Sequence, residues 1–530
     1  MDIDCLPFKK TGYFSNLICD YIAGDKKVSP LYHRFPDLKG FKAQIEEKGN
    51  SFPAAHRKTL VESLRKQYSG LDASQKTLQN ITDLNEANTY TVVTGHQLNL
   101  FTGPLYFLYK IISTINLTEE LKYEYPKFNF VPVYWMATED HDFEEINYFN
   151  FRGKKIQWNK DASGAVGHLD TEGLKEVFQT FSNAIGNSNN AEFLKTLFEK
   201  AYLEHETLTE ATRFLANALF KDYGLVIVDG DDTNLKRLLI ACAKQDIFER
   251  TTFKAVSATI DRMPSEYTVQ VSPREINYFY LMDGLRERIV EANGKYGVHG
   301  QSIIWDREEL LQELDAHPER FSPNVITRPL YQEVILPNLC YIGGGGEIAY
   351  WLELKSSFEA MEVPFPILLL RNSVLVITEK QSDKLKKMQL SEEDLFLKQS
   401  SLINKKIREI SNIDIDFSPQ KKHLEEQFKD LYILAEKTDK SFIGAVKAQE
   451  VKQKKGLDNL EKRLLKAQKR KLKDHVRRMT DIQNELFPGK SLQERNLNFS
   501  ELYLEYGDEL IPMLVKALKP LRLEFTVLTV

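Results

Sequence analysis

An apolar strand followed by a polar loop and then a helix recurs along the first 370 residues of the chain. Residues 90–93 form a short β-branched run that enters the loop 94–97, and a helix is predicted from about 104 to 117. The apolar run 130–136 then predicts a strand buried on both faces. A strand, a helix and a second strand within about fifty residues indicate a parallel βαβ unit with a right-handed crossover.

Two further units of this kind follow. Residues 224–229 predict a third strand, which ends in an acidic loop ahead of a helix from about Asn234. Residues 339–342 predict a strand that runs into the glycines 343–346 and a helix, and residues 366–370 predict a last strand. Units in this order favour one doubly wound α/β core that is assembled from separated pieces of chain.

A chain of 530 residues is too long for one ordinary domain, and roughly 150 residues per domain would suggest three or four. The strand units predict instead one core with two insertions, which hold strand-like stretches at 146–151, 155–158, 267–271 and 276–280. The predicted segments are N-terminal helices with the first half of the core (1–145), a first insertion (146–200), more core (201–249), a second insertion (250–320), the second half of the core (321–377), a helical coiled coil (378–487) and a tail that docks on the core (488–530).

The coiled coil is predicted from a change in composition near residue 378. Gly and Pro become scarce, and apolar residues such as Leu457, Leu460 and Leu464 follow helical three-and-four steps. Residues 452–478 are strongly basic, which fits either the solvated outer face of the coiled coil or a phosphate-rich partner. The whole chain has 71 Lys and Arg against 76 Asp and Glu, a net charge of -5, so a nucleic-acid partner is not expected.

The four cysteines, Cys5, Cys19, Cys242 and Cys340, are scattered, and none has a second Cys or a His at metal-ligand spacing. Neither zinc nor any other metal site is therefore expected. The N-terminal residues hold no apolar signal segment, and no apolar stretch reaches the roughly 18 to 20 residues that a membrane span needs. A cytoplasmic chain without a membrane partner is expected.

Titratable residues gather after the second predicted strand, at Glu139, Asp140, His141 and Asp142. In a doubly wound sheet, ligands bind outside the carboxyl ends of the strands, so this position favours a functional site. Carboxylates flanking a histidine suit general acid/base work, an ammonium group or a divalent ion. The alternative is a capping loop, in which Asp140 or Asp142 accepts from helix N–H groups.

Other strand-end residues are candidates for binding an anion. The turn Thr102-Gly103-Pro opens a predicted helix, whose N-terminal N–H groups favour phosphate or carboxylate. The glycine run permits close backbone approach, although it is neither a P-loop nor a dinucleotide fingerprint. Arg371 lies in an otherwise apolar run and should have a partner. The candidates are Gly95, His96, Gln97, Thr102, Gly103, Asn324, Arg328, Gly343, Gly344, Gly345, Gly346, Glu347 and Arg371.

Three stretches carry most of these candidate residues, VTGHQLNLFTGPLYFLYKI at 93–111, VPVYWMATEDHDFEEIN at 131–147 and FSPNVITRPLYQEVILPNLCYIGGGGEIAYW at 321–351. In these stretches the chain resembles the cysteine ligase family of bacillithiol biosynthesis. The order of core pieces, insertions and a late coiled coil is also similar. The resemblance implies a Rossmann-like core similar to class I nucleotidyltransferases and aminoacyl-tRNA synthetases, with connecting-peptide insertions and a coiled coil that forms a homodimer.

The resemblance also implies an activity, the last step of the pathway, in which L-cysteine is joined by an amide bond to glucosaminyl malate. ATP or another adenine nucleotide would be the cofactor. Tyr106 and Tyr109, however, stand where the synthetases' HIGH-type signature has histidines, and Tyr106 joins the candidate binding residues for that reason. The alternative function is therefore a non-catalytic dimeric scaffold that binds a nucleotide or substrate in the same pathway.

The ligase reading assigns roles to the candidates. Substrate anions would bind Arg328 and the helix N-terminus at Gly103, with His96 and Gln97 as donors. Amines would bind the carboxylates of the acidic cluster, with His141, held charged by its neighbours, as the proton acceptor. The glycine loop and Glu347 would close the pocket.

Overall fold

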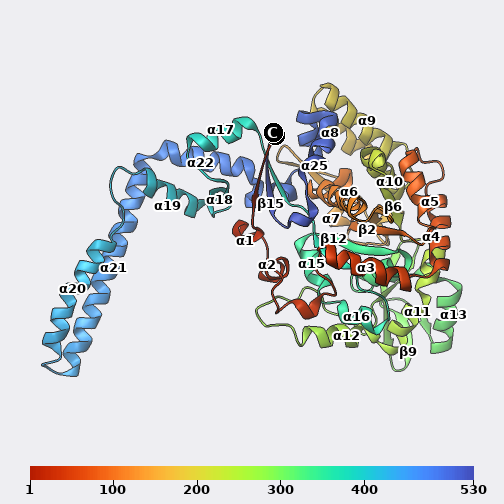
Figure 1. The fold of residues 1–530 in the computed structure, drawn as a ribbon, viewed down its shortest axis with the longest axis horizontal. Helices are drawn as coiled ribbons and strands as arrows, with labels where there is room; N and C mark the ends of the chain where they lie inside the picture. The colour runs from red at the N-terminus through yellow and green to blue at the C-terminus, as the bar shows by residue number, and fades with distance from the viewer. The chain divides into compact units, whose positions relative to one another are not determined.

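The computed structural model describes residues 1–530, which form two compact units (Figure 1). The larger unit holds residues 1–9, 13–376 and 491–528, and the smaller unit holds residues 10–12, 377–490 and 529–530. No helix in either unit is long and apolar enough to cross a membrane.

A five-stranded parallel sheet forms the centre of the larger unit. Its strands are β2 (Thr89–His96), β3 (Asn129–Met136), β6 (Val226–Asp229), β12 (Asn338–Gly343) and β13 (Ile367–Leu370). They lie in the order β13-β12-β2-β3-β6, so in chain order the sheet reads 5-4-1-2-3. This is the doubly wound order, and it confirms the predicted fold class. The strand order reverses between β2 and β12, where such sheets open a crevice for ligands.

The strands of this sheet are buried on both sides, because helices cover both of its faces. Figure 1 shows the sheet between α6 (Tyr106–Glu124) on one side and α3 (Leu38–Ser51) on the other. Phe41 and Ile45 of α3, with Leu117 and Leu121 of α6, belong to one buried cluster with Val92 and other strand residues. The remaining core helices are α2 (Asn16–Ile22), α4 (Ala54–Gln67), α5 (Gln75–Asp83), α10 (Leu208–Phe220), α11 (Thr233–Glu249), α12 (Thr251–Ile260), α14 (Arg328–Ile335), α15 (Gly345–Trp351) and α16 (Lys355–Ala360).

The segment predicted as the first insertion forms a hairpin, β4 (Tyr148–Phe151) with β5 (Lys154–Gln157), preceded by α7 (Phe143–Ile146) and followed by the helices α8 (Leu174–Ile185) and α9 (Asn189–Leu203). The segment predicted as the second insertion contributes four strands of a five-stranded antiparallel sheet, and the fifth strand, β11, lies just beyond it in the segment predicted as core. Its members are β7 (Tyr278–Met282), β8 (Leu285–Ala292), β9 (Lys295–Val298), β10 (Ile304–Trp305) and β11 (Phe321–Pro323), with α13 (Arg307–Ala316) before β11.

One strand prediction in this region is wrong, because residues 267–271 are not a strand. The backbone N–H groups of Gln270 and Val271 donate instead to the carboxylate of Glu353, at 2.7 and 3.2 Å. A buried side chain thus supplies the hydrogen bonds that a neighbouring strand would have given.

The two ends of the larger unit meet in a small sheet. β15 (Phe525–Thr529) lies between β1 (Asp2–Leu6) and β14 (Val374–Ile377). β1 was not predicted, because the first ninety residues have a helical and polar composition. The preceding tail holds α23 (Gln493–Asn496), α24 (Phe499–Tyr506) and α25 (Leu510–Ala517). Asn116 of α6 donates to the carbonyls of Val515 and Leu518, both at 2.8 Å, which ties the tail to the core.

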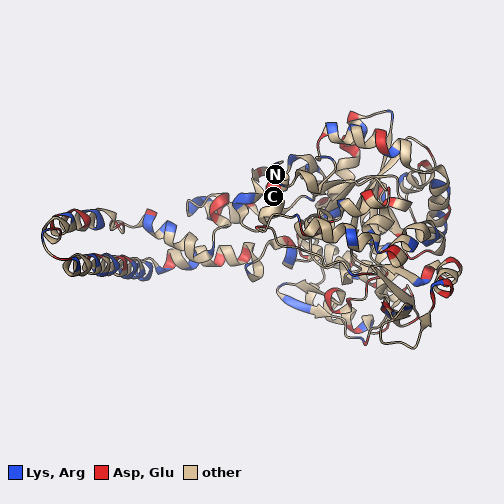
Figure 2. Ribbon diagram, turned by 90° about the horizontal axis from the view of Figure 1, so that it is seen from below, with Lys and Arg blue, Asp and Glu red and all other residues tan.

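The smaller unit is helical, as the composition predicted. It comprises α17 (Glu379–Lys387), α18 (Glu392–Leu395), α19 (Gln399–Ile410), α20 (Ser418–Ala435), α21 (Lys440–Lys471) and α22 (Lys473–Leu486). α20 and α21 lie side by side as a hairpin, and Figure 2 shows basic residues along both helices. Phe428, Ala435 and Val446 pack between them. Ion pairs of Lys421 with Asp458 and Glu461 add charged contacts across the hairpin.

Candidate active site

A cavity of about 750 Å³ lies at the carboxyl ends of the central strands. It is therefore at the position where a doubly wound sheet binds ligands. Most of the residues singled out from the sequence line it together, although they come from separate parts of the chain. These are Gly95, His96, Gln97, Tyr106, Glu139, Asp140, His141, Asp142, Asn324, Arg328, Gly344, Gly345, Gly346, Glu347 and Arg371.

Three singled-out residues, Thr102, Gly103 and Gly343, do not line the cavity. Thr102 and Gly103 have left-handed backbone angles, φ 67° and 62°, and α6 begins only at Tyr106. The Gly103 N–H donates to the carbonyl of Leu100 at 2.9 Å, so it is not free for an anion. A Cβ at Gly103 would lie 2.6 Å from that of Asn99, which requires glycine here. The turn is structural, and the proposed anion site at this helix N-terminus is wrong.

His96 ends β2 as a buried, neutral imidazole. Burial, followed by the nearby Lys110 charge, lowers its pKa to about 3. Its ring packs edge-on against Tyr106 at 5.5 Å between centroids, and its Nε2 has no partner. The adjoining Gln97 side chain is already occupied, because its Nε2 donates to Asp140 and Glu145 at 2.9 and 3.0 Å. Gln97 therefore fixes the acidic loop rather than offering a free donor.

A buried ion pair between Lys110 and Glu347 lies in the wall of the cavity. Lys110 Nζ is 2.6 Å from Glu347 Oε2 and 2.5 Å from the Gly95 carbonyl oxygen. Glu347 also accepts from the Tyr341 hydroxyl at 2.7 Å and the Gly344 N–H at 2.8 Å. Burial alone would raise the pKa of Glu347, but the charge of Lys110 together with the hydrogen bonds from Lys110, Gly344 and Tyr341 lowers that pKa. Lys110 was missed from the sequence, where its only signal is a lysine inside the apolar run of α6.

Arg328 begins α14 and lies among aromatic rings. Its guanidinium carbon is 5.6 Å from the ring centroid of Trp135, 5.7 Å from that of Tyr341 and 5.9 Å from that of Trp351. Nη1 donates to Gln332 at 3.1 Å, while the buried Nη2 has no partner. A buried cationic donor left unpaired is costly unless a ligand accepts from it. Arg328 can thus bind a carboxylate or phosphate.

Arg371 has the partner that its apolar surroundings required. Its Nη2 donates to Glu494 at 2.7 Å, and both side chains are almost fully buried. Its Nη1 donates to the Asn372 carbonyl and the Ser373 hydroxyl. The next tail residue, Arg495, lines the cavity and was not predicted. The C-terminal tail therefore supplies part of the wall of the cavity.

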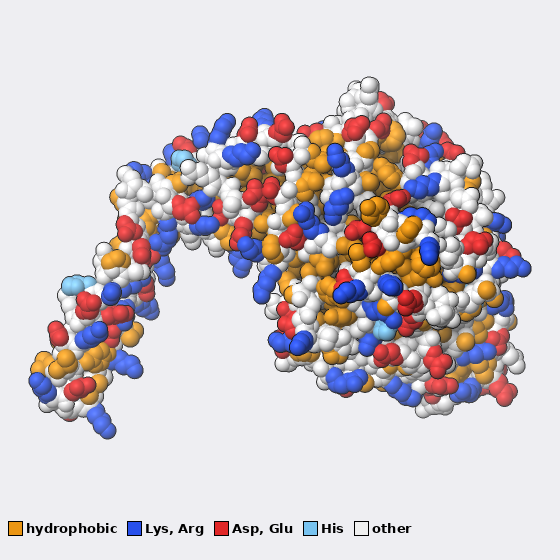
Figure 3. Space-filling model, viewed as in Figure 1, with side chains coloured by type: hydrophobic (Ala, Val, Ile, Leu, Met, Phe, Trp, Pro, Cys, Tyr) orange, Lys and Arg blue, Asp and Glu red, His pale blue; other side chains and the backbone are white.

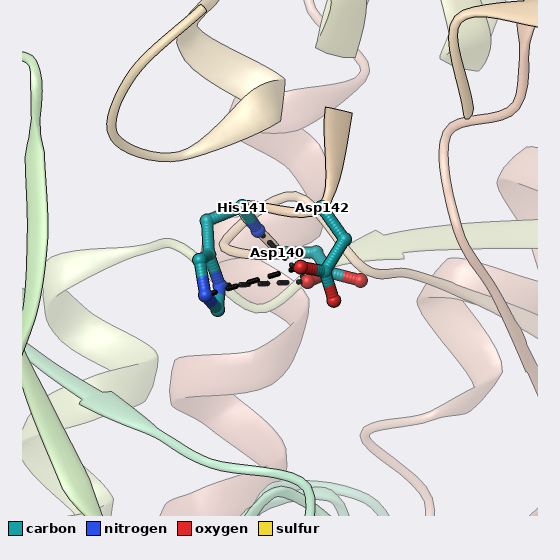
Figure 4. A group of neighbouring side chains, drawn as sticks. All are labelled: Asp140, His141 and Asp142. Atoms are coloured by element: carbon teal, nitrogen blue, oxygen red, sulfur yellow. Dashed lines mark hydrogen bonds and ion pairs between the residues drawn. The ribbon is translucent and has the colours of Figure 1, made fainter. Parts of the chain in front are cut away.

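The acidic loop also lines the cavity, and Figure 4 shows its Asp140, His141 and Asp142 side chains close together. The carboxylates of Asp140 and Asp142 lie 3.8 and 4.0 Å from nitrogens of the His141 ring. Burial and the neighbouring Asp140 raise the pKa of Asp142. Arg286 of β8 donates to His141 Nδ1 at 2.7 Å. A guanidinium only donates, so Nδ1 of His141 is the acceptor in this hydrogen bond.

Asp140, His141 and Asp142 hold their ligand atoms within 4.8 Å of one another, as a divalent cation would require. The Arg286 guanidinium beside His141 would repel such an ion. Glu139 points to a different partner, with its Oε1 2.6 Å from Lys236 Nζ. The cluster therefore has two parts. Asp140, His141 and Asp142 are partly exposed at the cavity, whereas Glu139 is buried in an ion pair with Lys236.

Known proteins resemble this chain over its full length. The family description "Bacillithiol biosynthesis BshC, N-terminal Rossmann-like domain" matches residues 1–372, and "Bacillithiol biosynthesis BshC, C-terminal coiled-coil domain" matches residues 374–530. Three relatives carry the name "Putative cysteine ligase BshC". The protein of Christiangramia forsetii is 61% identical (100% of this chain, 99% of the relative), that of Flavobacterium johnsoniae is 58% identical (100% of both) and that of Bacillus cytotoxicus is 29% identical (94% and 95%).

A solved structure from Campylobacter jejuni, titled as a putative arginyl-tRNA synthetase, aligns with 85% of this chain and 98% of its own at 11% identity. Its TM-score of 0.21 is too low to carry an argument. The family matches cover both halves of the chain, and the relatives match it from end to end. The chain belongs to the BshC family of bacillithiol biosynthesis.

Proposed function

We propose that the chain is a ligase that joins L-cysteine to the amine of glucosaminyl malate by an amide bond, the last step of bacillithiol formation. The observation that carries this proposal is that charged side chains of both signs line one cavity. Arg328 and Arg495 supply cations, and Asp140 and Asp142 supply carboxylates. Substrates that bring both carboxylates and amines need both kinds of partner.

Each group has a role in this reaction. Arg328, with its unpaired Nη2, holds a substrate carboxylate. The carboxylates of the acidic loop attract the ammonium form of the amine and orient it toward the cysteine carboxyl carbon. Amide formation makes a C–N bond, breaks a C–O bond and releases a proton from nitrogen. The neutral imidazole of His96 offers an unpaired nitrogen to the same cavity.

An adenine nucleotide would supply the activation that an unreactive carboxylate needs. The residues present fit its phosphates. Gly345 and Gly346 begin α15, where first-turn N–H groups have no partner within the helix, and a Cβ at Gly346 would meet nothing within 4 Å. Arg495 adds a cation to the same cavity. These residues would hold phosphate oxygens, while Glu347 fixes the turn through the Gly344 N–H.

The proposed function predicts a product. Purified protein given cysteine, glucosaminyl malate and ATP should form bacillithiol, detected by mass spectrometry after thiol labelling. Omitting any one of the three should abolish the product. A variant with Asp140→Ala and His141→Ala should lose most of the activity, whereas His205→Gln, at a partly buried histidine that does not line the cavity, should not. Nucleotide binding without product would favour the non-catalytic scaffold instead.

We also propose that the chain forms a homodimer through the α20–α21 hairpin. This hairpin exposes apolar side chains that its own packing leaves uncovered, as Figure 3 shows toward its end. They are Leu431, Ile433, Leu434, Phe442, Val451 and Leu460. Exposed apolar residues on paired helices are typical of a coiled-coil interface.

The dimer proposal predicts a mass. Light scattering should give twice 61.3 kDa for the unaltered chain. Replacing Ile433 and Leu434 by Glu should give the monomer mass, because two carboxylates would be buried without partners. Lys447→Glu, a charged change at an exposed position of the same hairpin, should leave the dimer intact. A monomer mass for the unaltered chain would contradict the proposal.

A further inference from the structure

Six arginines line the cavity of about 750 Å³, and three of them have no partner within the protein. Arg371 and Arg286, by contrast, are held by hydrogen bonds to neighbouring protein groups. The three unpaired guanidinium groups are exposed and make no hydrogen bond or ion pair with the protein, and they belong to Arg274, Arg288 and Arg495. Like charges gathered in a hollow attract anions, so these groups are free to bind a ligand.

Two of the three unpaired arginines belong to the antiparallel sheet. Arg274 precedes β7, and Arg288 lies in β8 two residues after Arg286. Side chains alternate along a strand, so Arg286 and Arg288 share one face of β8. Phe279 of β7 lies directly opposite Arg288 and shares this face. Its ring centroid is 4.1 Å from the guanidinium carbon of Arg286 and 5.6 Å from the ring of His141, so this face of the sheet borders the acidic loop.

Arg286 fixes the sheet against the acidic loop and is not itself free for a ligand. Its Nη1 donates to His141 at 2.7 Å, its Nη2 to the Pro323 carbonyl at 3.2 Å and its Nε to the Ser322 hydroxyl at 3.1 Å. A strand rises about 3.3 Å per residue, so Arg288 lies about 7 Å further along the same face. One small molecule can therefore contact both the acidic loop and the unpaired guanidinium of Arg288.

The backbone that carries Arg274 is anchored to the core. The Arg274 N–H donates to Asn277 Oδ1 at 3.0 Å, and Asn277 Nδ2 donates back to the Arg274 carbonyl at 2.9 Å. Asn277 is fully buried, and its own N–H donates to Asp246 at 2.9 Å while its carbonyl accepts from the Thr327 hydroxyl at 2.7 Å. Only the side chain of Arg274 has to be ordered when an anion binds, which lowers the entropic cost of binding.

We propose that Arg274 and Arg288 bind the two carboxylates of the malyl group of glucosaminyl malate, and that this pair selects the substrate that receives cysteine. This inference rests on the proposed ligase function. In glucosaminyl malate the amine and the malyl group are attached to neighbouring carbons of the sugar ring, so they must be bound close together. With the amine at Asp140 and Asp142, the malyl carboxylates lie toward the adjoining face of β8.

The phosphates of a nucleotide are the other anions that these arginines would attract. The proposed phosphate position is at the start of α15, where Arg495 is the added cation. Arg274 and Arg288 come from the antiparallel sheet instead. The malyl group presents two separate planar carboxylates, and a guanidinium fork matches one planar carboxylate with two N–H groups. Two unpaired arginines therefore suit a dicarboxylate, and the test must measure both ligands.

Isothermal titration calorimetry on the full chain tests the assignment without any catalytic step. We expect Arg274→Gln and Arg288→Gln each to raise the Kd for glucosaminyl malate about tenfold, because each removes charge-assisted hydrogen bonds to a carboxylate. The Kd for ATP should stay the same in both variants, which also shows that they are folded. Arg288→Lys should recover part of the affinity, because the positive charge remains.

The control variant is Arg262→Gln, at an exposed arginine of the same insertion that does not line the cavity, and it should bind glucosaminyl malate as the unaltered chain does. Steady-state kinetics give a second readout. The KM for glucosaminyl malate should rise in Arg274→Gln and Arg288→Gln, while the KM for cysteine stays the same. Methyl glucosaminide, which lacks the malyl group, should be used equally poorly by the unaltered chain and by both variants.

The outcomes separate this assignment from the ligase proposal. Unchanged affinity for glucosaminyl malate in both Gln variants would overturn the malyl site, and product formation by the unaltered chain would still support the ligase. A tenfold loss of affinity for ATP, with glucosaminyl malate bound as before, would assign these arginines to phosphates and also overturn the malyl site. A chain that binds glucosaminyl malate through both arginines but forms no product with cysteine and ATP would overturn the ligase function alone.

Discussion

Replacing Arg371 by methionine should lower the free energy of unfolding by about 3–5 kcal/mol, because the change leaves Glu494 as a buried carboxylate without its partner. The two side chains are 4% and 1% exposed, and their atoms lie 2.7 Å apart. Glu494 also accepts from the Ser373 hydroxyl and the Val374 N–H, so it cannot turn toward water without losing those hydrogen bonds.

Urea unfolding followed by tryptophan fluorescence measures this loss. The chain has four tryptophans, Trp135, Trp158, Trp305 and Trp351, and all of them lie in the larger unit. The double variant Arg371→Met with Glu494→Leu should recover most of the stability, because no charge then stays buried alone. Lys27→Met, which breaks an exposed pair with Glu266, should change the free energy of unfolding far less. Equal decreases in the free energy of unfolding for Arg371→Met and Lys27→Met would show that burial of the Arg371–Glu494 pair does not matter for stability.

The second large effect is expected at Arg328. Arg328→Lys should reduce kcat/KM about 100-fold, which corresponds to roughly 2.7 kcal/mol of lost transition-state binding. Lysine keeps the positive charge but loses the planar fork that can hold a carboxylate with two N–H groups. It also loses the donor that contacts Gln332, which fixes the guanidinium among Trp135, Tyr341 and Trp351.

Steady-state kinetics with each substrate varied in turn would identify the carboxylate that Arg328 holds. The KM that rises most in Arg328→Lys belongs to that substrate. Arg237→Lys, an arginine on α11 that does not line the cavity, is the matched control and should keep the original kcat/KM. An unchanged kcat/KM in Arg328→Lys would show that Arg328 does not bind a substrate.

The central sheet and the position of the site follow from local sequence signals. Apolar runs predicted β3, β6, β12 and β13 closely, because strands buried on both faces need continuous apolar sequence. β2 is longer than predicted, since Thr94, Gly95 and His96 were expected in a loop and belong to the strand. Polar residues that directly follow such runs, such as His96 and Asp140, then lie at one edge of the sheet, since parallel strands end on the same side. This geometry explains why residues separated by more than 200 positions could be grouped before the fold was known.

The remaining site residues depend on long-range packing that local sequence does not encode. Lys110 and Lys236 lie within helices, where a lysine is usually solvated, and only their partners Glu347 and Glu139 explain their burial. Arg286 and Arg495 come from the antiparallel sheet and from the tail, which have no sequence pattern linking them to the core. The turn at Thr102 and Gly103 failed as an anion site because its left-handed backbone ends in a hydrogen bond to Leu100.

The pair of Arg371 with Glu494 has a consequence for synthesis on the ribosome. The two residues are 123 positions apart, and the whole helical hairpin is translated between them. At a translation rate of about 5–20 residues per second, roughly 6–25 seconds pass between the synthesis of Arg371 and that of Glu494. Until then the apolar end of β13 holds an unpaired guanidinium. A nascent or prematurely ended chain that stops before the tail therefore lacks both this ion pair and Arg495, so only a fully translated chain can complete the site.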